Sequence, residues 1–396
     1  MCNLETVEIP ILLNLECYLI TYTMNKQKIL MFISVIGMTI IIPCVVYPCT
    51  TFVLHKGDKL VFGRNLDWYS GTGLVIVNPR NLEKVALVNS SEKPVKWVSK
   101  FGSMTFNQIG RELPFGGINE SGLVVEHMTL DETVYPSKDN RYVIGAFQWI
   151  QFQLDNYLTI EEVINSDTLL RIVDDSKIHF LVCDRLGNSA TIEFLNGKMV
   201  YHTGKDLPIH ALSNSTYEES VSCYNNNSDT QSNPSLYHFC TAAKQTNHVE
   251  PLTDDSTIDY AFRTLNMVGQ VLFTKWSIVY DITNMRIYFK VFETPVIDGE
   301  KKIFMRQPPY DPTTKVVDFK GLDFNCSGIV KVFDINSNYD KIVNQYFIPY
   351  SIDINKEFIA KAFTFYKGWG LNIELKEDDL NSLAKYPESF RCIGDK

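Results

Sequence analysis

The sequence lacks the residue patterns that most often bind metals. Its seven histidines include no His-x-x-x-His or His-Glu-x-x-His motif, and its nine cysteines include no Cys-x-x-Cys pair. Zinc sites usually take their ligands at such short spacings. The sequence therefore argues against a metal-dependent reaction, and we expect the protein to need no cofactor.

Positive charge is also scarce. The chain has 37 Lys and Arg residues against 46 Asp and Glu residues, which gives a formal net charge of -9. A nucleic-acid partner would call for a basic face, and the sequence has no basic run, low-complexity tract or internal repeat. We therefore expect no nucleic-acid partner. With 45% hydrophobic and 21% charged residues, the 396-residue chain can bury a sizeable core.

An apolar leader precedes the domain. From Met24 onward a short cationic segment leads into a hydrophobic run over residues 29–42, which is typical of a secretory signal. We expect residues 1–48 to be this leader, with Met24 as the alternative start, and residues 49–396 to form the folded domain. A cleaved leader implies a secreted or periplasmic protein that meets the membrane only before cleavage. A buried helix and an uncleaved anchor are the alternatives, although the run is short for a membrane span.

The residue before the expected cut is unusual. Signal cleavage prefers a small residue at that position, whereas this chain has Pro48. Two routes could therefore give a chain that begins at Cys49. Either the leader is cut elsewhere and the remaining residues are trimmed, or the protein cuts the bond before Cys49 itself. A lipidated cysteine would also want a small residue in the preceding segment, which Val46, Tyr47 and Pro48 do not supply.

A cut at this point would give Cys49 both a thiol and a free α-amino group. Residues 50–54 and 60–62 predict a hairpin, which would bring Arg64 and Asp67 back beside Cys49. The α-amine, with an ordinary pKa of about 7.7 to 8.0, is a suitable base for the thiol. Arg64 would favour the thiolate, and Asp67 would orient the amine. The alternative is a strand cysteine with an ordinary surface Arg/Asp pair.

The remaining cysteines do not suggest a disulfide framework. Six cysteines follow Pro48, so five remain if Cys49 is a free nucleophile, and an odd number cannot all pair. We therefore expect the fold to be held by its core rather than by disulfides.

Short strands alternate with amphipathic helices, which predicts a layered α+β fold. The polar residues 222–255 suggest a long surface excursion near the site, and the glycines of residues 114–122 suggest a tight turn. Further strands are expected at residues 73–77, 104–106, 123–128, 178–183, 190–194, 198–202, 276–281, 285–289, 316–319 and 329–333, and helices at residues 142–156, 159–164, 259–273, 354–366 and 380–386.

Several sequence blocks follow one another in a characteristic order. The blocks are Cys-Thr-Thr (49–51), Phe-Gly-Arg-Asn-Leu-Asp-Trp (62–68), Val-Ile-Val-Asn-Pro-Arg-Asn (75–81), Gly-Ile-Asn-Glu-Ser-Gly-Leu (117–123), Ala-Leu-Ser-Asn-Ser-Thr-Tyr (211–217) and Trp-Ser-Ile-Val-Tyr-Asp (276–281). Their order resembles that of the choloylglycine hydrolase and penicillin V acylase family of N-terminal nucleophile (Ntn) hydrolases, and the blocks cover nearly all of the chain from Cys49.

The resemblance implies a fold and a reaction. The fold would be a four-layer αββα sandwich of two stacked antiparallel sheets flanked by helices. The reaction would be hydrolysis of a linear, non-peptide C-N amide through a thioester on Cys49, with a small-molecule N-acyl amide such as a conjugated bile salt or penicillin V as substrate. A homo-oligomer is also implied. An acyltransferase using the same acyl-enzyme and a non-catalytic secreted or anchored binding protein are the alternatives.

The resemblance also assigns further site residues. Asn214 matches the family's oxyanion-hole asparagine, although alone it could be a turn residue or part of a glycosylation sequon. Arg263 is the candidate for an active-site arginine carried by a helix, but its neighbours depart from the family's Ser-Arg-Phe context, and a surface arginine is the alternative. Thr129 stands where relatives carry Asn or Tyr, and its hydroxyl offers a single hydrogen-bond donor.

Overall fold

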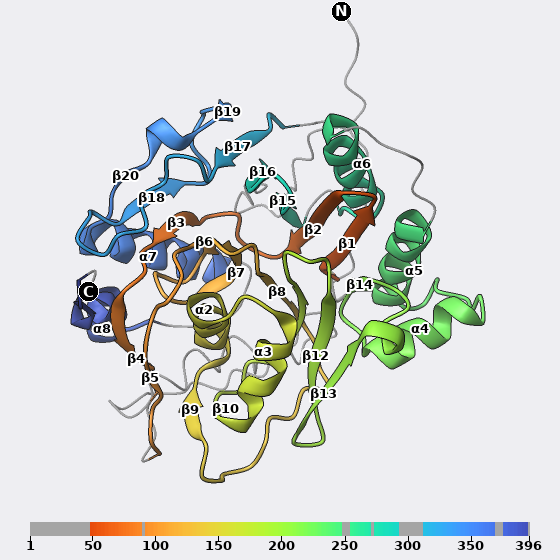
Figure 1. The fold of residues 1–396 in the computed structure, drawn as a ribbon, viewed down its shortest axis with the longest axis horizontal. Helices are drawn as coiled ribbons and strands as arrows, with labels where there is room; N and C mark the ends of the chain where they lie inside the picture. The colour runs from red at the N-terminus through yellow and green to blue at the C-terminus, as the bar shows by residue number, and fades with distance from the viewer. Residues whose placement is uncertain are drawn as a thin grey trace, which may run out of the picture.

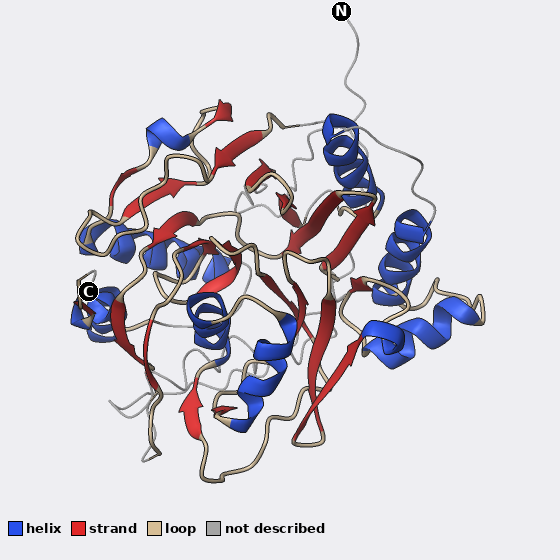
Figure 2. Ribbon diagram, in the orientation of Figure 1, coloured by secondary structure: helices blue, strands red, loops and turns tan. Residues whose placement is uncertain are grey.

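The computed structural model describes residues 48–88, 92–247, 254–270, 273–292, 312–368 and 375–394. The expected leader up to residue 47, including Met24, lies outside the described residues. Within the described ranges, two large sheets face each other and helices cover their outer sides (Figure 1). The helices of residues 217–267 gather on one side of the molecule, and those of residues 352–385 lie on the opposite side (Figure 2).

The first large sheet contains the predicted hairpin as its second and third strands. It has seven strands, and all neighbours are antiparallel except the last pair, β17 and β19, which are parallel. In sheet order the strands are β14 (Ala211–Leu212), β1 (Thr50–Lys56), β2 (Lys59–Asp67), β15 (Thr274–Asp281), β16 (Arg286–Val291), β17 (Lys315–Asp318) and β19 (Lys341–Ile342).

The second large sheet has nine strands, all paired antiparallel. Its strands in order are β13 (Lys198–Thr203), β12 (Ser189–Leu195), β11 (Ile178–Cys183), β8 (Val124–Thr129), β7 (Pro114–Asn119), β6 (Ser103–Asn107), β3 (Leu74–Asn78), β18 (Lys331–Asp334) and β20 (Ile348–Pro349). Two small sheets join β9 (Tyr142–Ile144) to β10 (Leu170–Ile172), and β21 (Arg391–Cys392) to β4 (Leu82–Val85) and β5 (Lys96–Val98).

Helices cover the outer face of each sheet. On the seven-stranded sheet, Asn65 of β2 donates to the carbonyl of Leu265 in α6 at 2.8 Å. On the nine-stranded sheet, the rings of Phe115 in β7 and Phe147 in α2 are stacked 5.2 Å apart. The result is the predicted αββα order of layers. The helices are α2 (Ala146–Asn156), α3 (Ile160–Asn165), α4 (Tyr217–Asn225), α5 (Pro234–Asn247), α6 (Asp254–Met267), α7 (Ile352–Gly368) and α8 (Glu377–Lys385).

Aromatic side chains fill the space between the sheets. Phe106 of β6 lies 6.2 Å from the ring of Trp276, 6.2 Å from Tyr280 and 5.5 Å from Phe289, all three on the other sheet. These rings are at most 1% exposed. Buried aromatic pairs of this kind contribute through both area and edge-to-face geometry. The core that holds the site in place is therefore the inner layer between the two sheets.

Two sequence predictions of local structure were wrong in part. The helix expected at residues 142–156 is interrupted at Gly145, which is extended, so that residues 142–144 form β9 and only α2 is helical. The surface excursion expected at residues 222–255 is largely helical. Phe239, Ala242 and Ala243 of α5 are fully buried, because apolar residues recur at helical spacing inside this polar segment.

The glycine-rich segment also differs from the prediction. Gly116 and Gly117 lie within β7, and the turn follows them at Gly122, which has a φ of +93°. A Cβ atom on Gly116 would overlap the carboxylate of Glu126, and one on Gly117 would overlap the carbonyl of Met104. These two glycines therefore permit close approach inside a sheet, rather than turn geometry.

The described residues contain one disulfide. Cys326 and Cys392 are bonded, with their Cα atoms 5.4 Å apart, while Cys49, Cys183, Cys223 and Cys240 are free thiols. A single bridge tying the C-terminal strand β21 to the segment after β17 is not a framework. The extensive core remains the main source of stability.

Candidate active site

The β1–β2 hairpin brings Cys49 to the end of β2. Thr51 pairs with Arg64 and Thr50 pairs with Asn65, so the residue before β1 lies level with the last residues of β2. The thiol of Cys49 donates to the backbone carbonyl of Asp67 at 3.6 Å. The sequence prediction that a hairpin gathers these residues thus agrees with the geometry.

Arg64 is fully buried between the sheets. Its Nε lies 2.5 Å from Oε2 of Glu126 in β8, and its terminal nitrogen donates to the carbonyl of His127 at 3.1 Å. The hydroxyl of Tyr280 donates to the other oxygen of Glu126 at 2.5 Å. Burial raises the pKa of Glu126 to about 7, against the opposing effects of Arg64 and the hydrogen bond from Tyr280. Arg64 is therefore held by the opposite sheet.

Asp67 sits beside a second cation. Its Oδ1 accepts a hydrogen bond from Thr274 of β15, and Lys275 follows Thr274 in the chain. The β2–β15 register shifts between Thr274 and Trp276, which makes Lys275 a bulge residue, and bulges commonly re-aim a side chain. Burial raises the pKa of Asp67 to about 7 and lowers that of Lys275 to about 8, while the attraction between the two charges opposes both shifts.

The thiol of Cys49 is protonated in this form of the chain, in which residue 49 is still joined to Pro48. Cys49 is 4% exposed, and burial raises its pKa to about 12, although the positive charge of Arg64 acts in the opposite direction. Desolvation of the buried thiol therefore outweighs the attraction between Arg64 and a thiolate in this form of the chain. A base next to the sulfur is therefore needed for attack.

Asn214 and Thr129 come together from different elements. The side-chain nitrogen of Asn214 donates to the hydroxyl of Thr129, and the backbone N–H of Asn214 donates to Ser235 in α5 at 2.8 Å. The adjacent Ser213 donates to the carbonyl oxygen of Cys49 at 2.8 Å. An amide nitrogen carries two hydrogens, so Asn214 keeps one beyond its bond to Thr129.

A small cavity of about 30 Å³ adjoins Cys49. That volume holds little more than a water molecule, whereas ligand pockets usually measure several hundred Å³. Apolar side chains dominate its walls, and Thr129 and His127 add polar groups. The lining residues are Cys49, Leu66, Trp68, Phe115, His127, Thr129, Phe147, Ser176, Lys177 and Ile178.

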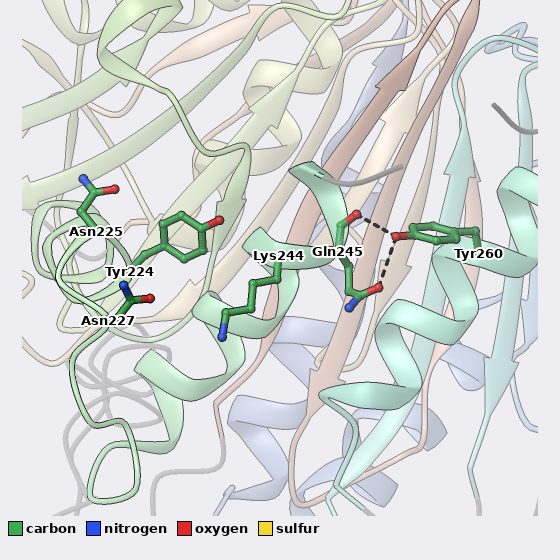
Figure 3. A pocket seen from close by; sticks show the side chains of 6 residues that line it. All are labelled: Tyr224, Asn225, Asn227, Lys244, Gln245 and Tyr260. Carbon is green, nitrogen blue, oxygen red and sulfur yellow. Dashed lines mark hydrogen bonds between the residues drawn. The ribbon is translucent and has the colours of Figure 1, made fainter. Parts of the chain in front are cut away.

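Arg263 is not part of this cluster. It lies on the exposed face of α6, with its guanidinium 5.5 Å from the ring centre of Tyr260. Tyr260 in turn lines a polar hollow of about 580 Å³, which lies between the C-terminal ends of α4 and α5 and helix α6. The hydroxyl of Tyr260 donates hydrogen bonds to the backbone and side-chain carbonyl oxygens of Gln245 (Figure 3). The surface alternative for Arg263 therefore fits the structure, and the active-site assignment does not.

Sequence reasoning missed several residues of the site. Glu126, Thr274, Lys275 and Ser213 all contact or adjoin the predicted residues. One signal was available for Glu126: a carboxylate that follows Val124 and Val125 in a mostly apolar strand requires a buried partner. The other three are ordinary strand or turn residues, and only the strand order brings them to Cys49.

Within the described residues, no three His, Cys, Asp or Glu side chains group as a metal ion would require. No helix in those same ranges is both long and apolar enough to cross a membrane.

Comparisons with known proteins place this geometry in a family. Residues 49–245 match the family model of the linear amide C-N hydrolases, choloylglycine hydrolase family. A penicillin V acylase of Pectobacterium atrosepticum is 27% identical over 182 residues, which cover 41% of this chain and 48% of that protein. The chain thus aligns with about half the length of this curated relative.

Solved structures share the fold. A penicillin V acylase from Agrobacterium tumefaciens has a TM-score of 0.63 and 24% identity, covering 76% of this chain and 98% of its own. A variant of the conjugated bile acid hydrolase from Clostridium perfringens has a TM-score of 0.55 and 15% identity, covering 75% of this chain and 99% of its own. The stacked sheets and flanking helices are therefore those of the Ntn hydrolase fold.

Proposed function

The chain belongs to the choloylglycine hydrolase family of linear amide C-N hydrolases, and we propose that it hydrolyses an N-acyl amide with Cys49 as an N-terminal nucleophile. The observation that carries this proposal is the position of the Cys49 thiol. The thiol lies at the end of the hairpin, against the backbone carbonyl of Asp67. Cys49 also lines a cavity whose wall includes Thr129, the hydrogen-bond partner of Asn214.

Each residue then has a distinct role. The α-amine of the cleaved chain takes the thiol proton, and the sulfur attacks the amide carbonyl to give a tetrahedral intermediate. The free N–H of Asn214 stabilises the oxyanion. Collapse expels the amine with the proton, and water hydrolyses the thioester to release the acid. Asp67 orients the α-amine, and Arg64, held by Glu126, sets the local positive potential.

The cavity walls indicate the acyl side of the substrate. Trp68, Phe115 and Phe147 present apolar surface next to the sulfur, so we infer an apolar or aromatic acyl group. Conjugated bile salts, phenoxyacetyl penicillins, N-acyl homoserine lactones and fatty-acyl amides all offer one. Because the cavity measures only about 30 Å³, such a group can enter only if these side chains move apart.

The disulfide bears on location. Such bonds persist in oxidising compartments, and Cys326–Cys392 therefore supports the proposal that the domain is secreted or periplasmic once its leader is removed. Self-association into a homo-oligomer remains a prediction from the family resemblance.

A substrate panel tests the proposal. Purified protein is incubated with amides of the four acyl classes, and free amine is measured with and without an added amine acceptor. We expect hydrolysis of at least one class, a large loss of turnover in Cys49→Ser, and a 10²- to 10³-fold lower kcat with little change in KM in Asn214→Ala. Full activity in Cys49→Ser would contradict the assignment, and acyl transfer in place of hydrolysis would change the reaction class.

A further inference from the structure

A buried histidine and a buried glutamate hold the segment that carries Asn214. His179 of β11 is fully buried, and Glu193 of the adjacent strand β12 is 1% exposed. Nδ1 of His179 lies 3.1 Å from Oε1 of Glu193, and Nε2 of His179 lies 2.6 Å from the carbonyl oxygen of Ser213. The same oxygen of Glu193 accepts a hydrogen bond from the backbone N–H of Tyr217 at 3.0 Å. The pair therefore contacts both ends of the turn that joins β14 to α4.

The hydrogen-bond partners show where the protons of this pair lie. A carbonyl oxygen can only accept a hydrogen bond, so Nε2 of His179 carries a proton and donates it to Ser213. Because Oε1 of Glu193 already accepts from Tyr217, its contact with Nδ1 needs a second proton between the two atoms. The other oxygen of Glu193 is buried and has no hydrogen-bond partner among the described residues. The position of the carboxyl group therefore depends on His179 and Tyr217.

The peptide group between Ser213 and Asn214 is held on both sides. Its carbonyl oxygen accepts a hydrogen bond from His179, and its N–H donates to the hydroxyl of Ser235 in α5 at 2.8 Å. A peptide group is planar, so partners on both sides fix its orientation and the direction in which the Asn214 side chain leaves the backbone. That side chain donates to Thr129, which lines the small cavity. The proposed oxyanion donor is thus linked to His179 through a single peptide group.

We propose that His179 and Glu193 are positioning residues that set the direction of the Asn214 side chain. Neither residue lines the small cavity, so both act through the backbone. His179 holds the carbonyl of Ser213, while Glu193 holds the ring of His179 and the first N–H of α4. An oxyanion donor is effective only within about 2.7 to 3.1 Å of the developing charge. This inference rests on the function proposed above and adds two residues to it.

A purely structural pair is the alternative. Buried carbonyl groups and the first N–H groups of a helix need partners in any fold. The two roles differ in what a substitution changes. Loss of a structural residue lowers stability whether or not Asn214 is present, whereas loss of a positioning residue lowers kcat only while Asn214 is there to be positioned.

The first test compares two variants of His179 that differ in reach. His179→Gln places an amide N–H near the former Nε2 and keeps a donor for Ser213, whereas His179→Asn reaches only the former Nδ1. We expect kcat to fall at least about tenfold in the Asn variant, with KM within about twofold, and to stay within about threefold of wild type in the Gln variant. Equal losses of kcat in the two variants would remove His179 from the positioning role.

A matched control lies on the same strand as Glu193. Thr191 is buried two residues away, and its hydroxyl contacts Nδ1 of His202 at 3.2 Å. Thr191→Val removes this buried hydrogen bond without touching the turn before α4. We expect this variant to lose stability in urea unfolding but to keep the kcat of wild type, and a loss of kcat equal to that of His179→Asn would contradict a specific role for His179.

A double-variant cycle asks whether His179 acts through Asn214. In the Asn214→Ala background the donor is already absent, so His179→Asn should lower kcat further by less than about twofold. Circular dichroism confirms folding, and kcat is expressed per folded chain. The same fold-change in both backgrounds would show that the two residues act independently, and it would overturn the proposal.

Ser235→Ala releases the other side of the same peptide group and changes the core less. We expect it to lower kcat at least about threefold in the wild-type background and to have little effect in Asn214→Ala. A wild-type kcat in Ser235→Ala would contradict the held peptide group. This variant keeps the inference testable even where His179→Asn does not fold.

Crystal structures of the two His179 variants keep this inference apart from the proposed function. We expect the Asn214 side chain to remain on Thr129 in His179→Gln and to leave it in His179→Asn. An unmoved Asn214 in His179→Asn would overturn the inference, whether or not the protein hydrolyses an amide. If Asn214 moves as expected while the wild type hydrolyses no amide of the panel, the proposed function is wrong and the positioning role is retained.

Discussion

The reactivity of the Cys49 thiol should depend on whether the bond before it has been cut. Burial raises the pKa of Cys49 from 9.0 to about 12 in the uncut chain. A rise of three units lowers the thiolate fraction at pH 7 about 10³-fold. The more basic sulfur is a better nucleophile, with a Brønsted slope of about 0.4 to 0.5, which recovers roughly 15- to 30-fold. The uncut chain should therefore react with iodoacetamide at least about 30-fold more slowly than free cysteine.

One sample reports on both forms. After trypsin digestion, cut chains give the peptide 49–56 and uncut chains give the peptide 29–56, in which fragment masses distinguish Cys49 from Cys44. We expect rapid alkylation only in the shorter peptide, because only that form has an α-amine next to the sulfur. Cys183, whose pKa burial also raises to about 12, is the internal control for a protected thiol. Equal rates for Cys49 in the two peptides would refute the reasoning.

Three further predictions concern stability. In Gly116→Ala the new Cβ must displace the carboxylate of Glu126 from its buried ion pair, so urea unfolding should show a loss of at least about 3 kcal/mol, and an unchanged midpoint would contradict the packing. Because burial raises the pKa of Asp67 from 3.8 to about 7, the folded state holds a proton there that the unfolded state has lost. The free energy of unfolding should therefore fall as pH rises from about 4 to about 7. The Asp67→Asn variant should reduce that fall by up to about 4 kcal/mol. Identical pH profiles of the free energy of unfolding in wild type and variant would argue against a raised pKa at Asp67. The Cys326–Cys392 bridge closes a separation of 66 residues, so Cys326→Ser should lower stability by up to about 4 kcal/mol, and reductant should lower the Tm of the wild type but leave that of the variant unchanged.

Local contacts were the part of the site that the sequence predicted. Arg64 and Asp67 reach Cys49 through a hairpin, and hairpin pairing follows from short-range alternation and a polar turn. The layered α+β fold and its Ntn class also agree with the structure and the comparisons.

Contacts between distant segments were not predictable in the same way. Glu126 reaches Arg64 only because β8 and β2 face each other across the sandwich, and no local pattern sets that alignment. Helix α5 was not predicted because the polar segment around it suggested a loop, whereas Phe239 and its apolar neighbours fold this segment as a helix against β1. Arg263 was assigned by resemblance at a position where the surrounding residues depart from the family, and it is the assignment that the structure does not support.

The most direct test of the account is to trap the acyl-enzyme. Purified active protein is mixed with its best amide substrate, quenched in acid within the first turnover, and digested for mass spectrometry. The account predicts the acyl group on Cys49 in a peptide whose N-terminus is Cys49 itself. An acyl group on any other residue, or full activity in chains where Pro48 still precedes Cys49, would contradict it.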